Sequence, residues 1–484
     1  MSEHRKRLGQ FFTPPEVAKA LVSWLGLTAT DRMLDPSCGD GQFLRCHKRS
    51  VGIEVDPENA ALARLRAPGA LVHGGDFFSW ANNTKERFEA VAGNPPFIRY
   101  QLFMGDTRQL AIESAQRLGA AFSGLASSWP LFLVVASGLL KPDGRMAFVV
   151  PAELGHASYA RPLIRALCGM FERVHVVACR EKLFPQLSED CWILHCSGYG
   201  GHTTEIALTT MDTFGAPAAV PRATRRVPLT EWEAMGARLR PFLLGSDAIA
   251  LYQSLAGTAD IPRLGAVASA NIGYVSGAND FFHLRPSEVK RREIPKKFLR
   301  PAVRKSSQLP EEVVERKTVQ TWRDQDAPFL LLDLAGKGNL PASVWEYLDQ
   351  EQAHEVKAGY KCRQRDPWYA VPDVVVPDAF LSVMCGERPS LVRNEARCVC
   401  TNTLHAVRLK PGVELLRLQM GWNTSLAQLG AEIEGHPLGG GMLKLEPREA
   451  ARVPVPMKPL NLSRADIETV HNAVTTLRRW RHNA

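Results

Sequence analysis

The sequence predicts a doubly wound α/β domain in the first half of the chain and an α+β domain in the second half. Three observations lead to this prediction. Short apolar runs alternate with helical segments between residues 32 and 196, which is typical of a largely parallel sheet. Several of these runs end in acidic or amide residues, as strands do at a ligand-binding edge. Residues 213–228 are then rich in proline and small residues, which indicates a linker.

The length of 484 residues suits two domains better than one. We expect a first domain at residues 1–212, a linker at 213–228 and a second domain at 229–484. The net charge of +9 points to a polyanionic partner. The ten cysteines lack the paired spacing of a zinc site, so we expect no metal and reduced thiols in a cytoplasmic protein. No segment has the pattern of a signal peptide or a membrane span.

The segment from Thr13 predicts the first helix. Apolar residues recur at helical spacing after Pro15. We expect Thr13 as the N-cap, Pro14 as the first helical residue and Glu16 as the partner in a capping box. Ordinary helix-start chemistry explains this pattern, and a ligand contact would explain it equally well.

Seven strands and further helices are predicted for the same domain. The apolar runs indicate strands at residues 32–34, 51–56, 71–73, 89–92, 145–150, 174–178 and 191–196. Helices are expected at residues 57–66, at 131–140 and from about Gln42. Ligand sites in doubly wound sheets gather at the carboxyl ends of strands. The residues that follow these strands are therefore the candidates for a functional site.

The loop after the first strand carries two glycines. It reads Asp35-Pro36-Ser37-Cys38-Gly39-Asp40-Gly41. The glycines let the backbone approach a ligand closely. A third glycine at the dinucleotide spacing and the lysine of a phosphate loop are both missing. The loop therefore favours a nucleotide cofactor without a pyrophosphate.

Acidic residues also end the second and third strands. Glu54, followed by Val55, stands where a ribose diol would be held. Asp76 with Phe77 adds a carboxylate and an aromatic ring at the end of the third strand. One such acidic residue is more often a helix cap than a ligand contact, but three in register favour a binding site.

The fourth strand stops abruptly in Asn94-Pro95-Pro96-Phe97. The prolines lack N–H groups, so the segment presents carbonyl oxygens. Asn94 adds a side-chain acceptor and Phe97 a flat apolar face. These groups suit a planar substrate whose amino hydrogens point at the Asn94 side chain and the Pro95 carbonyl. A tight turn after a buried strand is the alternative, and the motif alone does not decide between them.

In this order, the motifs resemble the gamma-class amino-methyltransferases that modify adenine in DNA, above all the Taq-type enzymes of restriction-modification systems. The resemblance rests on residues 12–15 (Phe-Thr-Pro-Pro), 35–41, Glu54, 75–77 and 94–97, and it covers the first domain. It implies a seven-stranded, Rossmann-like domain that depends on S-adenosylmethionine. A target-recognition domain would follow it.

The resemblance also implies a role for each matched residue. The residues expected to bind S-adenosylmethionine are Phe12, Thr13, Pro14, Asp35, Pro36, Cys38, Gly39, Gly41, Glu54, Val55, Asp76 and Phe77. Those expected to hold the extruded adenine are Asn94, Pro95, Pro96 and Phe97. Phe184, in the sequence Leu-Phe-Pro-Gln, would pack against the same base, with a core phenylalanine as the alternative.

The second half carries a basic stretch at residues 290–305 and a basic and aromatic cluster at residues 361–369. Most charge runs are solvated faces, but phosphate contact is the better interpretation after a methyltransferase core. The residues expected to contact DNA are Arg291, Arg292, Lys296, Lys297, Arg304, Trp368 and Tyr369.

These observations lead to one expected function and two alternatives. We expect a site-specific DNA adenine-N6 methyltransferase that acts on a flipped adenine in a restriction-modification or related defence system. The alternatives are an RNA-base or protein-glutamine methyltransferase with the same Asn-Pro-Pro-aromatic site, and a catalytically silent DNA-binding subunit. Double-stranded DNA is the expected partner of a monomer without membrane contact. The resemblance also allows a separately encoded restriction endonuclease as a partner.

Overall fold

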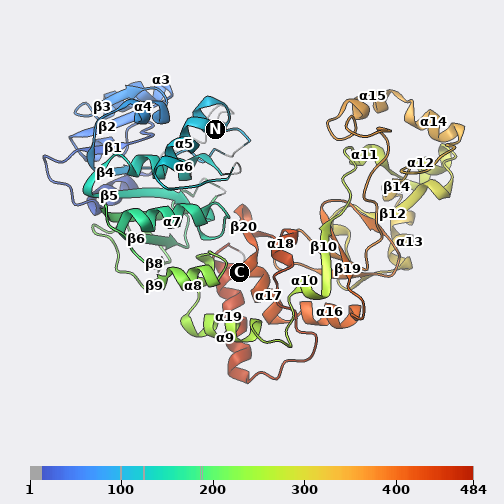
Figure 1. Cartoon of the computed structure of the whole chain (residues 1–484). Helices are drawn as coiled ribbons and strands as arrows, with labels where there is room; N and C mark the ends of the chain where they lie inside the picture. Colours follow the sequence, from blue (N-terminus) through green and yellow to red (C-terminus); the bar gives the residue numbers. More distant parts are fainter. Residues whose placement is uncertain (1–12, 99–100, 124–125, 186, 188, 483–484) are drawn as a thin grey trace. The chain divides into compact units, whose positions relative to one another are not determined.

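The computed structural model of the chain describes residues 13–98, 101–123, 126–185, 187 and 189–482. The chain divides into two compact units, Met1–Leu243 and Leu244–Ala484, and Figure 1 shows the elements of each. We predicted a linker at residues 213–228, but the first unit continues beyond it. Residues 225–228 form a strand of that unit's sheet.

The first unit contains a nine-stranded sheet. In order across the sheet, its strands are β3 (Leu71–Gly74), β2 (Ser50–Glu54), β1 (Met33–Asp35), β4 (Phe88–Gly93), β5 (Leu140–Pro151), β7 (Cys191–Tyr199), β6 (Phe171–Cys179), β8 (Glu205–Met211) and β9 (Arg225–Pro228). Strands β1 to β5 are parallel, and β7 is antiparallel to both of its neighbours. The carboxyl ends of β1 to β4 therefore meet at one edge of the sheet.

All seven predicted strands are present, as β1 to β7, so the prediction of a Rossmann-like sheet is confirmed. Strands β8 and β9 were not predicted. In β9 only Val227 is buried, between the exposed Arg226 and Pro228. A short edge strand of this kind carries too little apolar pattern to be recognised.

The helices of the first unit are α2 (Pro15–Trp24), α3 (Pro57–Arg66), α4 (Phe77–Asn83), α5 (Asp106–Arg117), α6 (Ser128–Ser137), α7 (Ala160–Met170) and α8 (Leu229–Ala234), with short 3-10 turns η1 (Leu44–Cys46), η2 (Ala152–Gly155) and η3 (Arg240–Leu243). Helix α3 has the predicted bounds, and Asp56 caps it by accepting a hydrogen bond from the Glu58 N–H at 2.9 Å.

Three details of the predicted helices are wrong. The helix predicted at residues 131–140 is α6, which lies three residues earlier, at Ser128–Ser137. The first helix begins one residue late, with Pro14 as a cap that makes no side-chain hydrogen bond, so the capping box at Thr13 does not form. The helix predicted from Gln42 is only the turn η1, because β2 already begins at Ser50 and leaves no room for more.

An apolar cluster joins α2 to one face of the sheet. Its strand members lie on the same face and, within a strand, are alternate residues: Met33, Ala90, Ala92, Ala147, Val149, Val177, Cys179, Cys191 and Ile193. Leu21 and Trp24 of α2 cover them. This packing fixes β4, the strand that leads to Asn94.

The second unit combines helices with small, mostly antiparallel sheets, as the α+β prediction requires. Its strands are β10 (Ala268–Ile272), β19 (Leu404–Leu409), β15 (Ala379–Ser382), β17 (Leu391–Asn394) and β13 (Val313–Val314) in one sheet; β11 (His283–Leu284), β14 (Leu330–Leu332), β12 (Leu299–Val303) and β18 (Val399–Cys400) in the next; and β16 (Met384–Cys385), β21 (Met442–Lys444) and β20 (His436–Leu438) in the third.

The helices of the second unit are α9 (Ser246–Ala256), α10 (Leu264–Val267), α11 (Asn279–Phe282), α12 (Pro286–Arg291), α13 (Arg316–Asp324), α14 (Ala342–Leu348), α15 (Glu351–Ala358), α16 (Leu415–Trp422), α17 (Ser425–Glu434), α18 (Pro447–Ala450) and α19 (Arg464–Arg479). Across the described residues of both units, no helix has the length and apolar character needed to cross a membrane.

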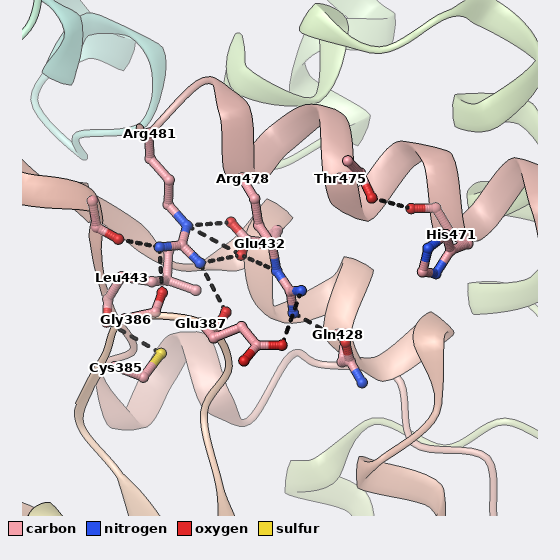
Figure 2. A network of polar contacts seen from close by, with 11 residues as sticks. Cys385, Gly386, Glu387, Gln428, Glu432, Leu443, His471, Thr475, Arg478 and Arg481 are labelled. Carbon is pink, nitrogen blue, oxygen red and sulfur yellow. Dashed lines mark hydrogen bonds and ion pairs between the residues drawn. The ribbon is translucent and has the colours of Figure 1, made fainter. Parts of the chain in front are cut away.

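A buried arginine anchors the end of α19 (Figure 2). Arg481 is fully buried, and its Nη2 donates hydrogen bonds to Glu432 Oε1 of α17 at 2.7 Å and to the Glu387 carbonyl at 2.9 Å. Its Nη1 donates to the Gly386 carbonyl at 2.5 Å. These bonds tie α17, α19 and the turn after β16 together.

Candidate active site

A cavity of about 300 Å³ opens at the carboxyl edge of the first unit's sheet. It is lined by residues that end or follow four neighbouring strands: Ser37 and Gly39, Glu54 and Val55, Asp76 and Phe77, and Asn94 and Pro96. The volume lies at the lower end of the range for small-molecule sites. The fold therefore brings motifs that are distant in the sequence to one place.

Glu54 joins the loop after β1 to the end of β2. Its Oε2 accepts a hydrogen bond from the Gly39 N–H at 2.8 Å, and its Oε1 accepts one from the Asp56 N–H at 2.8 Å. Glu54 is 5% exposed. Burial raises the pKa of this carboxyl, while the two N–H donors oppose the increase. The backbone thus orients both oxygens of a residue that also lines the cavity.

Close packing fixes the shape of the same loop. A Cβ atom at Gly52 of β2 would lie 2.7 Å from the Cys38 sulfur, so only glycine lets Cys38 pack there. Gly41 has a φ of +88°, which strains any residue with a side chain. Cys38 and Gly41 therefore shape the loop without lining the cavity.

Asp35 is buried where β1 lies beside β4. Its Oδ1 accepts a hydrogen bond from the Ser37 N–H at 3.1 Å, and a Cβ atom at Gly93 would lie 2.8 Å from that oxygen. Burial, together with the nearby carboxylates of Glu54 and Asp40, raises the pKa of Asp35 to about 8. With its pKa raised to about 8, Asp35 is mostly protonated at neutral pH and is a neutral carboxyl in the folded protein.

Asp76 caps α4 at the end of β3. Its Oδ1 accepts hydrogen bonds from the Ser79 N–H at 2.8 Å and from the Ser79 hydroxyl at 2.9 Å. Helix capping is the ordinary role of such a residue, and Asp76 fulfils it while also lining the cavity. The cap uses Oδ1, so it does not occupy Oδ2.

Aromatic rings form much of the cavity wall. Phe77 stacks on Phe132 of α6, with ring centroids 5.2 Å apart and an angle of 16° between the planes. Phe78 and Phe103 also line the cavity. Sequence analysis identified Phe77 alone, because no motif marks the other three. For Phe78, its place next to Phe77 was the one available signal.

Only some residues of the motif after β4 line the cavity. Asn94 is half-buried, Pro95 is buried, and Pro96 and Ile98 line the wall. Phe97 is half-buried and packs against the apolar cluster that includes α2. The segment therefore presents an amide and a proline to the cavity.

Several predicted residues do not line the cavity. Phe184 is 1% exposed inside the apolar cluster that includes α2, which agrees with the alternative of a core phenylalanine. Phe12 lies outside the described residues. The other predicted residues that are away from the cavity lining are Thr13, Pro14, Asp35, Cys38, Gly41, Pro95 and Phe97.

The residues predicted to contact DNA divide into exposed and half-buried ones. Arg291, Lys296 and Lys297 are exposed. They lie in α12 and in the 3-10 turn η4 (Lys296–Phe298), close together in the sequence. These three side chains can reach a phosphate backbone.

The other predicted DNA contacts are half-buried and contact neighbours within the second unit, where Arg291 also lies 4.0 Å from Glu288. Arg292 pairs with Glu288 at 3.2 Å, and Arg304 pairs with Asp280 at 2.8 Å. Trp368 packs against the two phenylalanines of α11, and Tyr369 packs in turn against Trp368. Charge and residue type alone could not separate these half-buried side chains from exposed ones.

The chain matches two domain families of DNA methyltransferases. The Type II methyltransferase M.Eco57I C-terminal domain matches residues 237–482, and the N-6 DNA Methylase domain matches residues 1–196. Type II methyltransferase M.AccI from Acinetobacter calcoaceticus is 20% identical over 466 residues, covering 92% of this chain and 85% of that protein. The chain belongs to the gamma-class N6-adenine methyltransferases of restriction-modification systems.

Further relatives share different parts of this methyltransferase. Type II methyltransferase M.CvrRI from Paramecium bursaria Chlorella virus XZ-6E is 38% identical over 184 residues, covering 36% of this chain and 45% of that protein. The solved Type IIL restriction-modification enzyme MmeI has a TM-score of 0.54 at 12% identity, covering 87% of this chain and 61% of the longer MmeI chain. The likeness to MmeI shows the fold alone.

Proposed function

We propose that this methyltransferase transfers a methyl group from S-adenosylmethionine to N6 of an adenine extruded from duplex DNA. The observation that carries the proposal is that Glu54, Asp76 and Asn94 line one cavity. Carboxylates suited to a nucleoside and an amide suited to an amino group thus lie at the same site.

The cavity fits S-adenosylmethionine, which supplies an electrophilic methyl group on a positively charged sulfur. Glu54 would accept hydrogen bonds from the ribose hydroxyls, and Asp76 would accept one from the adenine amino group. Phe77 and Phe132 would pack on the purine ring.

The chain's part in the reaction is to position the target amino group. The lone pair of adenine N6 is delocalised into the ring, which makes it a poor nucleophile. The Asn94 side-chain oxygen and the Pro95 carbonyl would accept the two N–H hydrogens and direct the lone pair at the methyl carbon. No protein nucleophile is needed, because positioning supplies much of the rate. Extrusion of the base costs a few kcal/mol, and stacking on Phe97 would offset roughly 1 to 3 kcal/mol of it.

The family matches favour DNA over RNA or a protein glutamine as the substrate. The presence of Glu54, Asp76 and Asn94 at the cavity argues against a catalytically silent subunit. We propose that the second unit contacts the duplex through the exposed Arg291 and Lys296.

Transfer of a labelled methyl group to duplex DNA, RNA and protein, measured in parallel, tests the proposal. We expect label in duplex DNA, recovered as N6-methyladenine after digestion to nucleosides. Label on cytosine would overturn the assigned base. Label in RNA or protein alone would overturn the assigned substrate.

A further inference from the structure

Ser128, the first residue of α6, makes three hydrogen bonds to the segment that follows Asn94. Its hydroxyl donates to the Pro96 carbonyl and accepts from the Ile98 N–H at 3.0 Å. Its own N–H donates to the Ile98 carbonyl at 3.0 Å. The three bonds lie on either side of Phe97, and Ser128 is fully buried.

The two prolines explain why an outside partner is needed. Pro95 and Pro96 have no N–H groups, so this segment cannot stabilise itself by the backbone hydrogen bonds of a helix or a strand. A hydroxyl can donate and accept at the same time, which is what the Pro96 carbonyl and the Ile98 N–H require of one side chain. Pro96 and Ile98 both line the cavity, so their placement sets its wall.

We propose that Ser128 is a positioning residue for methyl transfer, which holds the segment from Asn94 to Ile98 in its reactive arrangement without touching the substrate. The inference rests on the proposed function of Asn94. Loss of the hydroxyl would leave Pro96 and Ile98 without this partner and let the segment shift. A displacement of about 1 Å in a positioning group can lower a rate by about 100-fold.

Ser137 provides a matched control on the same helix. It is also fully buried, and its hydroxyl donates to the Val134 carbonyl of α6 at 2.7 Å. Ser128→Ala and Ser137→Ala therefore both remove a buried hydroxyl from α6. Only the first removes bonds to the segment after Asn94.

The test compares kcat, S-adenosylmethionine affinity and thermal stability for these two variants. We expect kcat to fall about 10- to 100-fold for Ser128→Ala and less than about 2-fold for Ser137→Ala, with cofactor affinity nearly unchanged in both. Equal kcat values for the two variants would overturn the inference. Loss of cofactor binding in Ser128→Ala would also overturn it, since that result indicates a collapsed cavity.

Ser128→Cys covers the case in which Ser128→Ala does not fold. The thiol has nearly the shape of the hydroxyl but is a weak donor and a weak acceptor. A lowered kcat at wild-type stability supports the positioning role, and a wild-type kcat overturns it. If the unchanged enzyme methylates no adenine in DNA, the proposed function fails with the inference. If the unchanged enzyme is active and the Ser128→Cys variant is equally active, the inference fails and the proposed function stands.

Discussion

The carboxylate of Glu54 accepts a hydrogen bond from the Gly39 N–H at 2.8 Å, and this bond joins the motif at the end of β2 to the loop after β1. The second carboxylate oxygen accepts a bond from the Asp56 N–H. One side chain thus orders two segments and lines the cavity. Its charge should therefore matter more to ligand binding than to folding.

Glu54→Gln should weaken S-adenosylmethionine binding by about 10- to 100-fold, since a hydrogen bond to a charged group contributes about 1.5 to 3 kcal/mol. An amide accepts at one atom only, so it cannot replace both bonds of the carboxylate. Calorimetric titration measures the affinity. Glu58→Gln, on the exposed face of α3, is the control and should bind as the unchanged protein does. Equal affinities for the two variants would contradict the role of Glu54.

Asn94→Ala should lower kcat by about 100- to 1,000-fold, because loss of one positioned group commonly costs about 3 to 4 kcal/mol of barrier. Cofactor and DNA binding should persist, as the other cavity residues remain. Single-turnover methylation of a duplex measures the rate. Asn83→Ala, exposed on α4, is the control. An Asn94→Ala variant with a kcat close to that of the unchanged protein would contradict the role assigned to Asn94.

Asp35 should make the stability of the protein depend on pH. Its pKa is raised to about 8 by burial in the folded state, so the folded protein retains a proton that the unfolded chain has lost. This carboxyl therefore lowers stability as the pH rises from about 4 to about 8, by at most about 1.4 kcal/mol per pH unit.

Urea unfolding at pH 6.5 and pH 8 measures this effect in the unchanged protein and in Asp35→Asn. The buried histidines, such as His175 and His195, are the same in both proteins, so the difference between the two isolates Asp35. We expect the unchanged protein to lose more stability across this interval. Parallel pH profiles would mean that Asp35 is already ionised in the folded protein.

Arg291→Gln combined with Lys296→Gln should weaken binding to every duplex alike. If both side chains contact phosphates, the slope of log affinity against log salt concentration should fall by roughly two units. S-adenosylmethionine affinity should not change. Arg417→Gln combined with Arg479→Gln, which removes two exposed charges on α16 and α19, is the control for net charge. An unchanged slope in the variant of Arg291 and Lys296 would identify these two residues as a solvated surface.

Arg481→Met should destabilise the second unit by about 3 to 5 kcal/mol, since the buried Glu432 would lose its ion pair at 2.7 Å and Arg478 lies farther away, at 3.6 Å. Arg479→Met, at an exposed position of α19, should change stability by less than about 0.5 kcal/mol. Urea unfolding measures both. Replacing Glu432 by leucine in the Arg481→Met protein should restore much of the loss. Similar stabilities for the two single variants would show that the buried pair is replaceable.

The sequence by itself determined the central sheet and the motifs at its edge. Strands β1, β2 and β4 to β7 were predictable because each carries a run of apolar residues that both faces of a covered sheet demand, and the edge strand β3 was predictable from its shorter apolar run. The polar residues after β1 to β4 were recognisable because parallel strands bring their carboxyl ends to one edge. These two patterns predicted Glu54, Asp76 and Asn94 as site residues. All three line the cavity.

Only the tertiary structure decided which side chains face the cavity and which are packed inside. Phe132 of α6 and Phe103 in the loop before α5 join the cavity wall without a motif, while Phe184 lies in the core. Likewise, Arg304 is half-buried and paired with Asp280, whereas Lys296 is exposed, although both are basic residues of one stretch. The reason is physical. Apolar character and charge are local properties of a residue, whereas burial and pairing depend on neighbours that the fold brings from elsewhere in the chain.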